Sequence, residues 1–278
     1  MTGRIVLGLE YAGNCFQGWQ SQPHGHTVQD VLEHALRCIT GEPVRTHCAG
    51  RTDSGVHATA QVIHFDTGKV RPLSAWVRGV NALLPAGVAV RWAVEASRDF
   101  HARYCAVERR YRYFLFNSPV RPGLLSGRVG WFHQPLDEAR MAEATAFLPG
   151  WHDFSTFRTA GCQAKTPVKL MHEASVRREG DFLVFDFRAN AFLHHMVRNL
   201  VGALVYIGKG YYPVDWLQEV LESRDRSRAA PTFPADGLYL CGVSYSSGWS
   251  LPDDGRIIAL PQLPAVMVSS ERHVPYSR

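Results

Sequence analysis

Residues 44–66 read VRTHCAGRTDSGVHATAQVIHFD, and this segment sets the strand arrangement of the first half of the chain. Its two ends, 44–49 and 60–66, are typical of β-strands. The turn between them, 50–55, has glycine at both ends, and Gly55 tolerates the positive φ angles of a tight turn. Two strands therefore follow one another here with no helix between them.

A strand and a helix precede this pair. Alternating apolar residues predict a strand over 4–11. An apolar stripe with helical spacing predicts a helix over 28–39. Thr27 stands where an N-cap belongs, and Asp30 follows three residues later, as in a capping box.

A second helix and two strands follow the pair. The helix is predicted over 72–84, with Pro72 in its first turn. Strands are predicted over 87–95 and 106–116. The first half therefore has the order β-α-β-β-α-β plus an extra strand, which is the ferredoxin-like pattern.

The second half mixes helices and strands in a similar way. The predicted helices are 137–148, 191–207 and 213–223, and the predicted strands are 168–178, 182–189 and 238–245. We expect an α+β fold of two ferredoxin-like, RRM-like halves, with mixed antiparallel sheets that flank a central RNA-binding cleft. The expected units are residues 1–105, residues 106–248 and a flexible tail, 249–278.

Composition sets broad limits on function. Lys and Arg number 30 against 25 Asp and Glu, and this mild excess permits a polyanionic partner without demanding one. The six cysteines include no C-x-x-C pair, which disfavours a disulfide framework or a zinc site and fits a reduced cytoplasm. We expect neither a signal peptide nor a membrane span.

The turn at 50–58 concentrates Arg51, Asp53 and His57 between small residues. A carboxylate on such a turn can act as a nucleophile or a general base. Alternatively, Asp53 only caps its own turn through its side chain, as aspartates often do. Local chemistry alone leaves both interpretations open.

The predicted strand at 106–116 carries interleaved arginines and aromatic residues. Side chains alternate along a strand, so Tyr111 and Tyr113 share one face while Arg110 and Arg112 share the other. Aromatic rings stack on unpaired bases and guanidinium groups bind phosphates, which suits RNA. The alternative is an amphipathic strand whose tyrosines belong to the core.

The predicted helix over 191–207 contains His194, His195 and Arg198. An arginine on an otherwise apolar helix needs an anionic partner, unless it only extends to the surface. Adjacent histidines on a helix point in different directions, so we expect no metal site here. The sequence has no P-loop and no G-x-G-x-x-G, so a nucleotide cofactor is unsupported.

Taken together and in order, these segments resemble the TruA-type tRNA pseudouridine synthases from about Arg4 to Tyr245. The motifs that carry the resemblance are Gly18-Trp19-Gln20-Ser21-Gln22, Thr27-Val28-Gln29, Gly50-Arg51-Thr52-Asp53, Val56-His57-Ala58, Leu84-Pro85, Phe100-His101-Ala102-Arg103, Arg110-Tyr111-Arg112-Tyr113, His152-Asp153-Phe154, His194-His195-Met196-Val197-Arg198-Asn199 and Gly237-Leu238-Tyr239-Leu240. Each motif is weak alone, but the ordered set is specific.

The resemblance implies an enzyme that isomerises uridine to pseudouridine in the anticodon stem-loop of tRNA, at tRNA positions 38, 39 and 40. It implies Asp53 as the catalytic aspartate, Tyr111 as the tyrosine that stacks on the base, and Arg198 as the partner of the aspartate. Arg51 would help to displace the target nucleotide. The family works as a homodimer with neither metal nor cofactor.

We further expect Arg103, Arg110, Arg112 and His194 to contact RNA, mostly through phosphates. Two residues depart from the family pattern: Ser54, where alanine is frequent, and Lys169, where arginine is common. The Lys169 departure is expected to affect an RNA or dimer contact. Competing hypotheses are a non-catalytic RNA-binding protein with Tyr111 and Tyr113 as a stacking platform, and a nucleoside or glycoside hydrolase that uses Asp53.

Overall fold

The computed structural model describes residues 3–252. Its strands are β1 (Gly3–Tyr11), β2 (His47–Cys48), β3 (His57–Thr67), β4 (Val88–Ala96), β5 (Ala106–Asn117), β6 (Gly130–Phe132), β7 (Gly150–Asp153), β8 (Val168–Glu179), β9 (Phe182–Ala189) and β10 (Leu238–Tyr245). Its helices are α1 (Val28–Thr40), α2 (Glu138–Thr145), α3 (Met196–Gly208) and α4 (Trp216–Ser223), with short helical turns η1 (Gly13–Cys15), η2 (Ala75–Gly79), η3 (Ser155–Phe157) and η4 (Arg226–Arg228). Most of the predicted tail, 253–278, lies outside the described residues.

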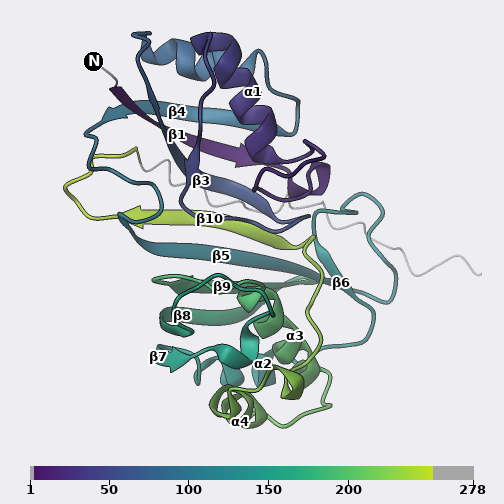
Figure 1. The fold of residues 1–278 in the computed structure, drawn as a ribbon. Coiled ribbons are helices and arrows are strands. Elements are labelled where there is room, and N and C mark those ends of the chain that lie inside the picture. The colour runs from purple at the N-terminus through teal and green to yellow at the C-terminus, as the bar shows by residue number, and fades with distance from the viewer. Residues whose placement is uncertain (1–2, 253–278) are drawn as a thin grey trace, which may run out of the picture.

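All strands belong to one ten-stranded sheet, with the main order β4-β1-β3-β10-β5-β9-β8-β7 (Figure 1). The α+β class is confirmed. The strands of the two halves, however, join edge to edge instead of forming two facing sheets. The joining strand is β10, which pairs parallel with β3 and antiparallel with β5. It pairs along most of β5 but with only two residues of β3, His57 and Ala58, and so links the strands of the two halves.

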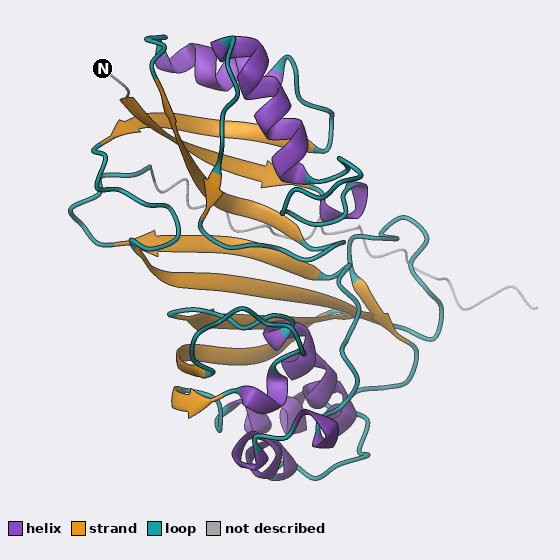
Figure 2. Ribbon diagram, in the orientation of Figure 1, coloured by secondary structure: helices purple, strands orange, loops and turns teal. Residues whose placement is uncertain are grey.

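The helices lie against both halves of this sheet, α1 beside the N-terminal strands and α2 to α4 beside the C-terminal strands (Figure 2). One continuous apolar core runs under them, from Leu7 and Leu36 to Phe185 and Leu200. Among the described residues, no helix is long and apolar enough to cross a membrane.

Local signals explain helix α1 well. The Oγ1 of Thr27 accepts a hydrogen bond from the backbone N–H of Asp30 at 3.2 Å and donates to its carboxylate at 2.5 Å. Gly41 ends the helix in the left-handed conformation, at φ 74°. The predicted cap and bounds of this helix are therefore confirmed.

Two predicted elements of the first half are shorter than expected. The helix predicted over 72–84 covers only 73–81, with the wide helical turn η2 in its middle. At its end, the side chain of Asn81 bonds the backbone N–H and C=O of Val90 at 2.7 and 2.8 Å. The strand predicted over 44–49 is reduced to β2, since Thr46 instead bonds the carboxylate of Glu33 on α1 at 2.8 Å.

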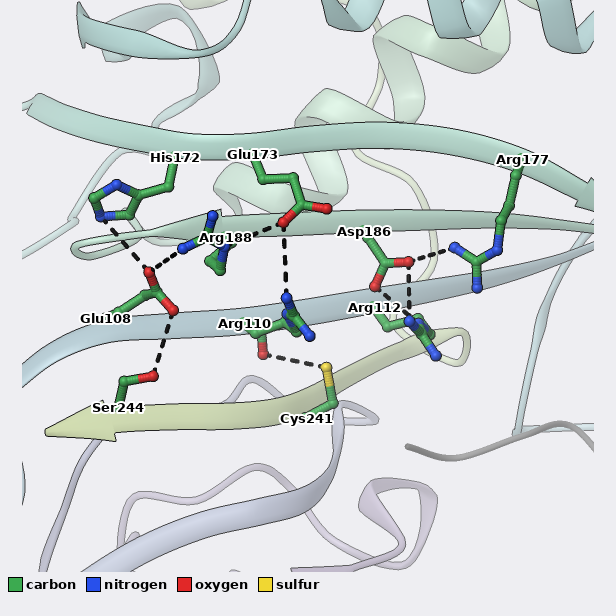
Figure 3. A network of polar contacts seen from close by, with 10 residues as sticks. All are labelled: Glu108, Arg110, Arg112, His172, Glu173, Arg177, Asp186, Arg188, Cys241 and Ser244. Atoms are coloured by element: carbon green, nitrogen blue, oxygen red, sulfur yellow. Dashed lines mark hydrogen bonds and ion pairs between the residues drawn. The ribbon is translucent and has the colours of Figure 1, made fainter. Parts of the chain in front are cut away.

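The sheet has two different faces. On β5, Tyr111 and Tyr113 point into the core beneath the helices, whereas Arg110 and Arg112 point to the opposite face. That opposite face carries a network of ion pairs that joins β5, β9 and β8 (Figure 3). The pairs are Arg112–Asp186 at 2.8 Å, Arg177–Asp186 at 2.5 Å, Arg188–Glu108 at 2.7 Å, Arg188–Glu173 at 3.1 Å and Arg110–Glu173 at 3.7 Å.

Candidate active site

A cleft of about 590 Å³ lies where the two halves meet, on the face of the sheet that carries the helices. Segments from both halves line it: 17–22 and 49–56 from the first, and 161–164 and 191–197 from the second. Tyr111 of β5 also lines it. The cleft therefore brings together the motifs that the sequence singled out.

Asp53 lies in this cleft on a turn that is fixed from several sides. The carbonyl oxygen of Thr52 accepts a hydrogen bond from the backbone N–H of Trp19 at 3.0 Å, and its hydroxyl lies 2.8 Å from that of Tyr11. Gly18 packs so closely that a Cβ there would stand 2.9 Å from this carbonyl. Within the described chain, the Asp53 side chain makes no hydrogen bond to the backbone, so it does not act as the cap of its own turn.

Three basic side chains surround the Asp53 carboxylate. The Nε2 of His194 lies 3.2 Å from Oδ1, and the Nε2 of His195 lies 3.3 Å from Oδ2. Arg198 places Nη1 3.7 Å from Oδ2, while its Nε donates to the carbonyl of Phe233 at 2.8 Å. Asp53 keeps 25% of its side chain exposed, so a substrate in the cleft can reach it.

The prediction that His194 and His195 lie on a helix and diverge is wrong. Helix α3 begins only at Met196, and His195 adopts the left-handed conformation, at φ 61°. This backbone geometry turns two consecutive rings toward one carboxylate, with ring centroids 4.0 Å apart. The ligand atoms of Asp53, His194 and His195 all lie within 4.8 Å of one another, so the group has the composition and spacing to hold a metal ion.

Burial disfavours the protonation of His195, and the charges around it act in both directions. Burial lowers the pKa of its imidazole, and the nearby charges of Arg198 and His194 lower it further, whereas the charge of Asp53 acts in the opposite direction. His195 is therefore a mostly neutral ring beside the carboxylate near neutral pH.

Tyr111 forms part of the cleft wall. It is 8% exposed, and its ring meets that of Phe192 edge-on at 5.0 Å. Its hydroxyl has no hydrogen-bond partner within residues 3–252 and is not enclosed. Burial raises the pKa of this phenol above its ordinary value, and the charge of Asp53 adds to the effect. The phenol thus remains protonated in the free protein.

Tyr113 has a different environment from Tyr111. Its side chain is fully buried, and its hydroxyl donates to the carbonyl of Pro234 at 3.0 Å. The ring cannot stack on a base without unfolding the core around it. The structure therefore does not support a stacking platform made of both tyrosines.

The predicted RNA-binding arginines separate into two groups. Arg51 and Arg103 are exposed at the cleft, and Arg51 donates to the side-chain oxygen of Gln163 at 3.0 Å across it. Arg110 and Arg112 lie on the opposite face of the sheet, within the ion pairs of Figure 3, so they do not contribute to this cleft.

The two departures from the family pattern have different surroundings. Ser54 lines the cleft, and its hydroxyl donates to the carbonyl of Phe16 at 3.4 Å. Lys169 is buried, and its ammonium group donates to the carbonyls of Thr166 and Val168 at 2.6 and 3.0 Å. The positive charge of Lys169 therefore interacts with carbonyl groups of its own turn.

Sequence reasoning missed Arg109. This side chain is only 9% exposed, and its guanidinium donates to four backbone carbonyls, those of Ala49, Arg103, Ala106 and Asn190. It thereby connects the strand before the Asp53 turn to the segment before His194. Strand alternation shows only that Arg109 shares its face with Tyr111, and it does not indicate which carbonyls the guanidinium binds.

Comparisons with known proteins identify the family of this chain. A family model described as tRNA pseudouridine synthase matches residues 9–105 and 144–246. The chain is 70% identical over 263 residues to tRNA pseudouridine synthase A of Aromatoleum aromaticum, covering 95% of this chain and 100% of the relative. It is 62% identical over 250 residues to the protein of the same name from Dechloromonas aromatica, covering 90% of this chain and 95% of the relative. The chain belongs to the tRNA pseudouridine synthase family.

Proposed function

We propose that this protein isomerises uridine to pseudouridine in the anticodon arm of tRNA, at positions 38, 39 and 40, with Asp53 as the catalytic carboxylate. The observation that carries the proposal is the position of Asp53, which stands in an open cleft beside Arg198, with Tyr111 in the wall of the same cleft. The curated relatives bear the name of this activity.

The reaction breaks the bond between C1′ of the ribose and N1 of uracil, and it forms a bond between C1′ and C5. The C5 proton leaves and N1 gains one, so no atom is added overall and no redox partner is required. Asp53 attacks either C1′ of the sugar or C6 of the base, and both routes fit its exposed carboxylate. Arg198 supplies the positive charge that favours an ionised carboxylate after RNA has excluded water from the cleft.

Tyr111 and Arg51 would handle the base. The Tyr111 ring offers an apolar surface on which the detached uracil can turn without leaving. The phenol, protonated in the free protein, would give its own proton to N1 of the detached base, and the resulting phenolate is the acceptor that we assign to the C5 proton. The target nucleotide must leave its stack, which costs a few kcal/mol. Arg51 stands at the cleft edge, where it can occupy the space that the base vacates.

Two observations weigh against the competing functions. Asp53 is the one carboxylate among the described residues that line the cleft, whereas most glycoside hydrolases use a pair of carboxyl groups. A passive RNA-binding platform would need an accessible Tyr113, and that residue is buried.

The assembly and its location follow the same proposal. Arg51 and Arg103 give the cleft a basic rim that suits the phosphates of an anticodon arm. We propose a homodimer, as the resemblance implies, and a cytoplasmic location, which fits the free cysteines of the described chain and a tRNA substrate.

The test is release of tritium from tRNA that carries C5-labelled uridine in its anticodon arm. An isomerase replaces the C5–H bond with a C–C bond and releases the label, whereas a hydrolase or a passive binder retains it. Label that remains on the RNA, under conditions where the protein binds that RNA, would overturn the proposal. Primer-extension mapping of the product would then locate the modified positions.

A further inference from the structure

We propose that Asp53, His194 and His195 bind one zinc-like transition-metal ion when the cleft is free of RNA, and that this ion excludes the substrate. The first support is the donor set. Two neutral imidazoles and one carboxylate are the protein ligands found in many open zinc sites, which leave a fourth position to water. The chain assembles these three donors around the carboxylate that catalysis would use.

The spacing of the donors also fits such an ion. In a tetrahedral site with metal–ligand bonds of about 2.0–2.1 Å, neighbouring ligand atoms stand roughly 3.3 Å apart. The Nε2 of His194 lies 3.2 Å from one oxygen of Asp53, and the Nε2 of His195 lies 3.3 Å from the other. The three ligand atoms, one from each residue, lie within 4.8 Å of one another, so an ion bound between the rings and the carboxylate would draw these side chains closer together.

The backbone of the two histidines is held in place by hydrogen bonds and by its conformation. His195 occupies the left-handed region at φ 61°, and its carbonyl accepts the N–H of Asn199 at 2.9 Å in the first turn of α3. The backbone N–H of His194 donates to the sulfur of Cys162 at 3.4 Å. Both histidines are thus fixed in a geometry that a regular helix does not provide.

The charge of Arg198 limits how tightly an ion binds, and the imidazole ligands determine which ions bind. Arg198, 3.7 Å from Asp53, repels any cation and keeps the affinity below that of a structural zinc site. The imidazoles select zinc, cobalt, nickel or copper over Mg²⁺, which prefers oxygen ligands and retains its water. The Mg²⁺ that folds tRNA would therefore leave this site free.

An ion on Asp53 would occupy the oxygens that attack the substrate, so metal and target uridine should exclude one another. This consequence rests on the proposed function, whereas metal binding itself rests only on the geometry. The two claims can therefore fail separately.

The binding experiment uses untagged, chelator-treated protein and follows Co²⁺ by visible absorption and Zn²⁺ by calorimetry. We expect one ion per chain and the d–d bands of a nitrogen–oxygen site, without the near-ultraviolet band of a cobalt–thiolate bond. His194→Ala and His195→Asn should each weaken binding at least tenfold. Asparagine at position 195 tolerates the left-handed backbone, and thermal melts check that both variants fold.

The matched control is the exposed pair His34 and Cys38 on α1, whose Nε2 and Sγ lie 4.0 Å apart. The double variant H34A/C38A should bind the ion as the unchanged protein does. A thiolate band, unaltered affinity in His195→Asn, or no binding at all would each overturn the proposed site.

The activity experiment comes second. Tritium release is first measured in chelator; inactivity at that stage contradicts the proposed function and leaves the metal site to be judged by binding alone. Where the protein is active, added Zn²⁺ should inhibit it competitively with tRNA, and added Mg²⁺ should not. Full activity with the site saturated by Zn²⁺ would refute the exclusion of substrate.

Discussion

Removing the hydroxyl of Tyr111 separates the two roles assigned to this residue. The variant Tyr111→Phe keeps the ring and its edge-on contact with Phe192 at 5.0 Å. Because the hydroxyl has no hydrogen-bond partner in the described chain, its loss should change the free energy of unfolding by less than about 0.5 kcal/mol. The thermal melt should therefore stay where it is.

The rate should respond very differently from the stability. If the phenol accepts the C5 proton, its removal should slow the chemical step by about 10²–10⁴-fold, the usual contribution of a positioned acid or base. Burial and Asp53 raise the pKa of the phenol in the free protein. When Asp53 attacks the substrate, its carboxylate loses its negative charge. One of the two causes that raise the pKa of the phenol is therefore absent when the C5 proton leaves.

The variant Tyr111→Ala removes the ring as well. Deleting a buried aromatic side chain costs about 3–5 kcal/mol, which lowers the melting temperature by roughly 6–20 °C in a protein of this size. Both the rate and the melt should therefore fall, and the comparison with Tyr111→Phe isolates the hydroxyl.

Single-turnover tritium release and thermal melts on the same preparations form the assay. The control is Tyr113→Phe, which loses the hydrogen bond to Pro234 and about 1 kcal/mol of stability but should keep its rate. A near-wild-type rate for Tyr111→Phe would refute proton transfer and leave Tyr111 as a stacking surface. A lowered melt for that variant would refute the claim that its hydroxyl lacks a structural partner.

Three further predictions concern other parts of the molecule. The variant Asp53→Asn should fold and bind tRNA but release no tritium, and measurable turnover in this variant would contradict the central role of the carboxylate. Arg51→Gln should reduce the salt dependence of tRNA binding, measured as the slope of log K against log salt, by about one; the control Arg110→Gln, on the opposite face, should leave the slope unchanged. Burial lowers the pKa of His64 to about 3, and His101 and Arg4 add to this effect. Below about pH 6.5 the His64 side chain therefore binds a proton in the unfolded chain but not in the folded chain. The free energy of unfolding should therefore fall as pH decreases from ~6.5 toward ~3, by at most about 1.4 kcal/mol per pH unit from this residue, and urea titrations in which His64→Gln keeps the full pH dependence would disprove the assignment.

The sequence predicts elements whose signals are local. Helix α1 follows from a cap, an apolar stripe and a terminal glycine that lie within fifteen or so residues, and the strand alternation of β5 assigns Tyr111 and Arg110 to opposite faces. The position of β10 is different, because its residues indicate a strand without indicating which two strands it joins. Its neighbours are determined by contacts between distant parts of the chain.

The candidate site shows the same division. Motifs locate Asp53, Tyr111 and Arg198, and the structure brings Arg198 to Asp53. The apolar spacing after residue 191 predicts a helix that begins several residues too early, since spacing carries no information about a left-handed residue such as His195. A guanidinium that binds only carbonyls, as that of Arg109 does, also has no complementary charge in the sequence that would reveal it.

The place of β10 in the sheet has a consequence for synthesis on the ribosome. Because this strand lies between β3 and β5, the first two hundred or so residues can emerge while β5 keeps most of one edge unpaired and β3 has only the two-residue β2 along part of the same edge. Unpaired strand edges promote association with other chains, and contacts between residues so far apart in sequence form slowly. The nascent chain is therefore most prone to aggregation in the interval before Leu238–Tyr245 leaves the exit tunnel, which makes this short strand the last step that completes the sheet.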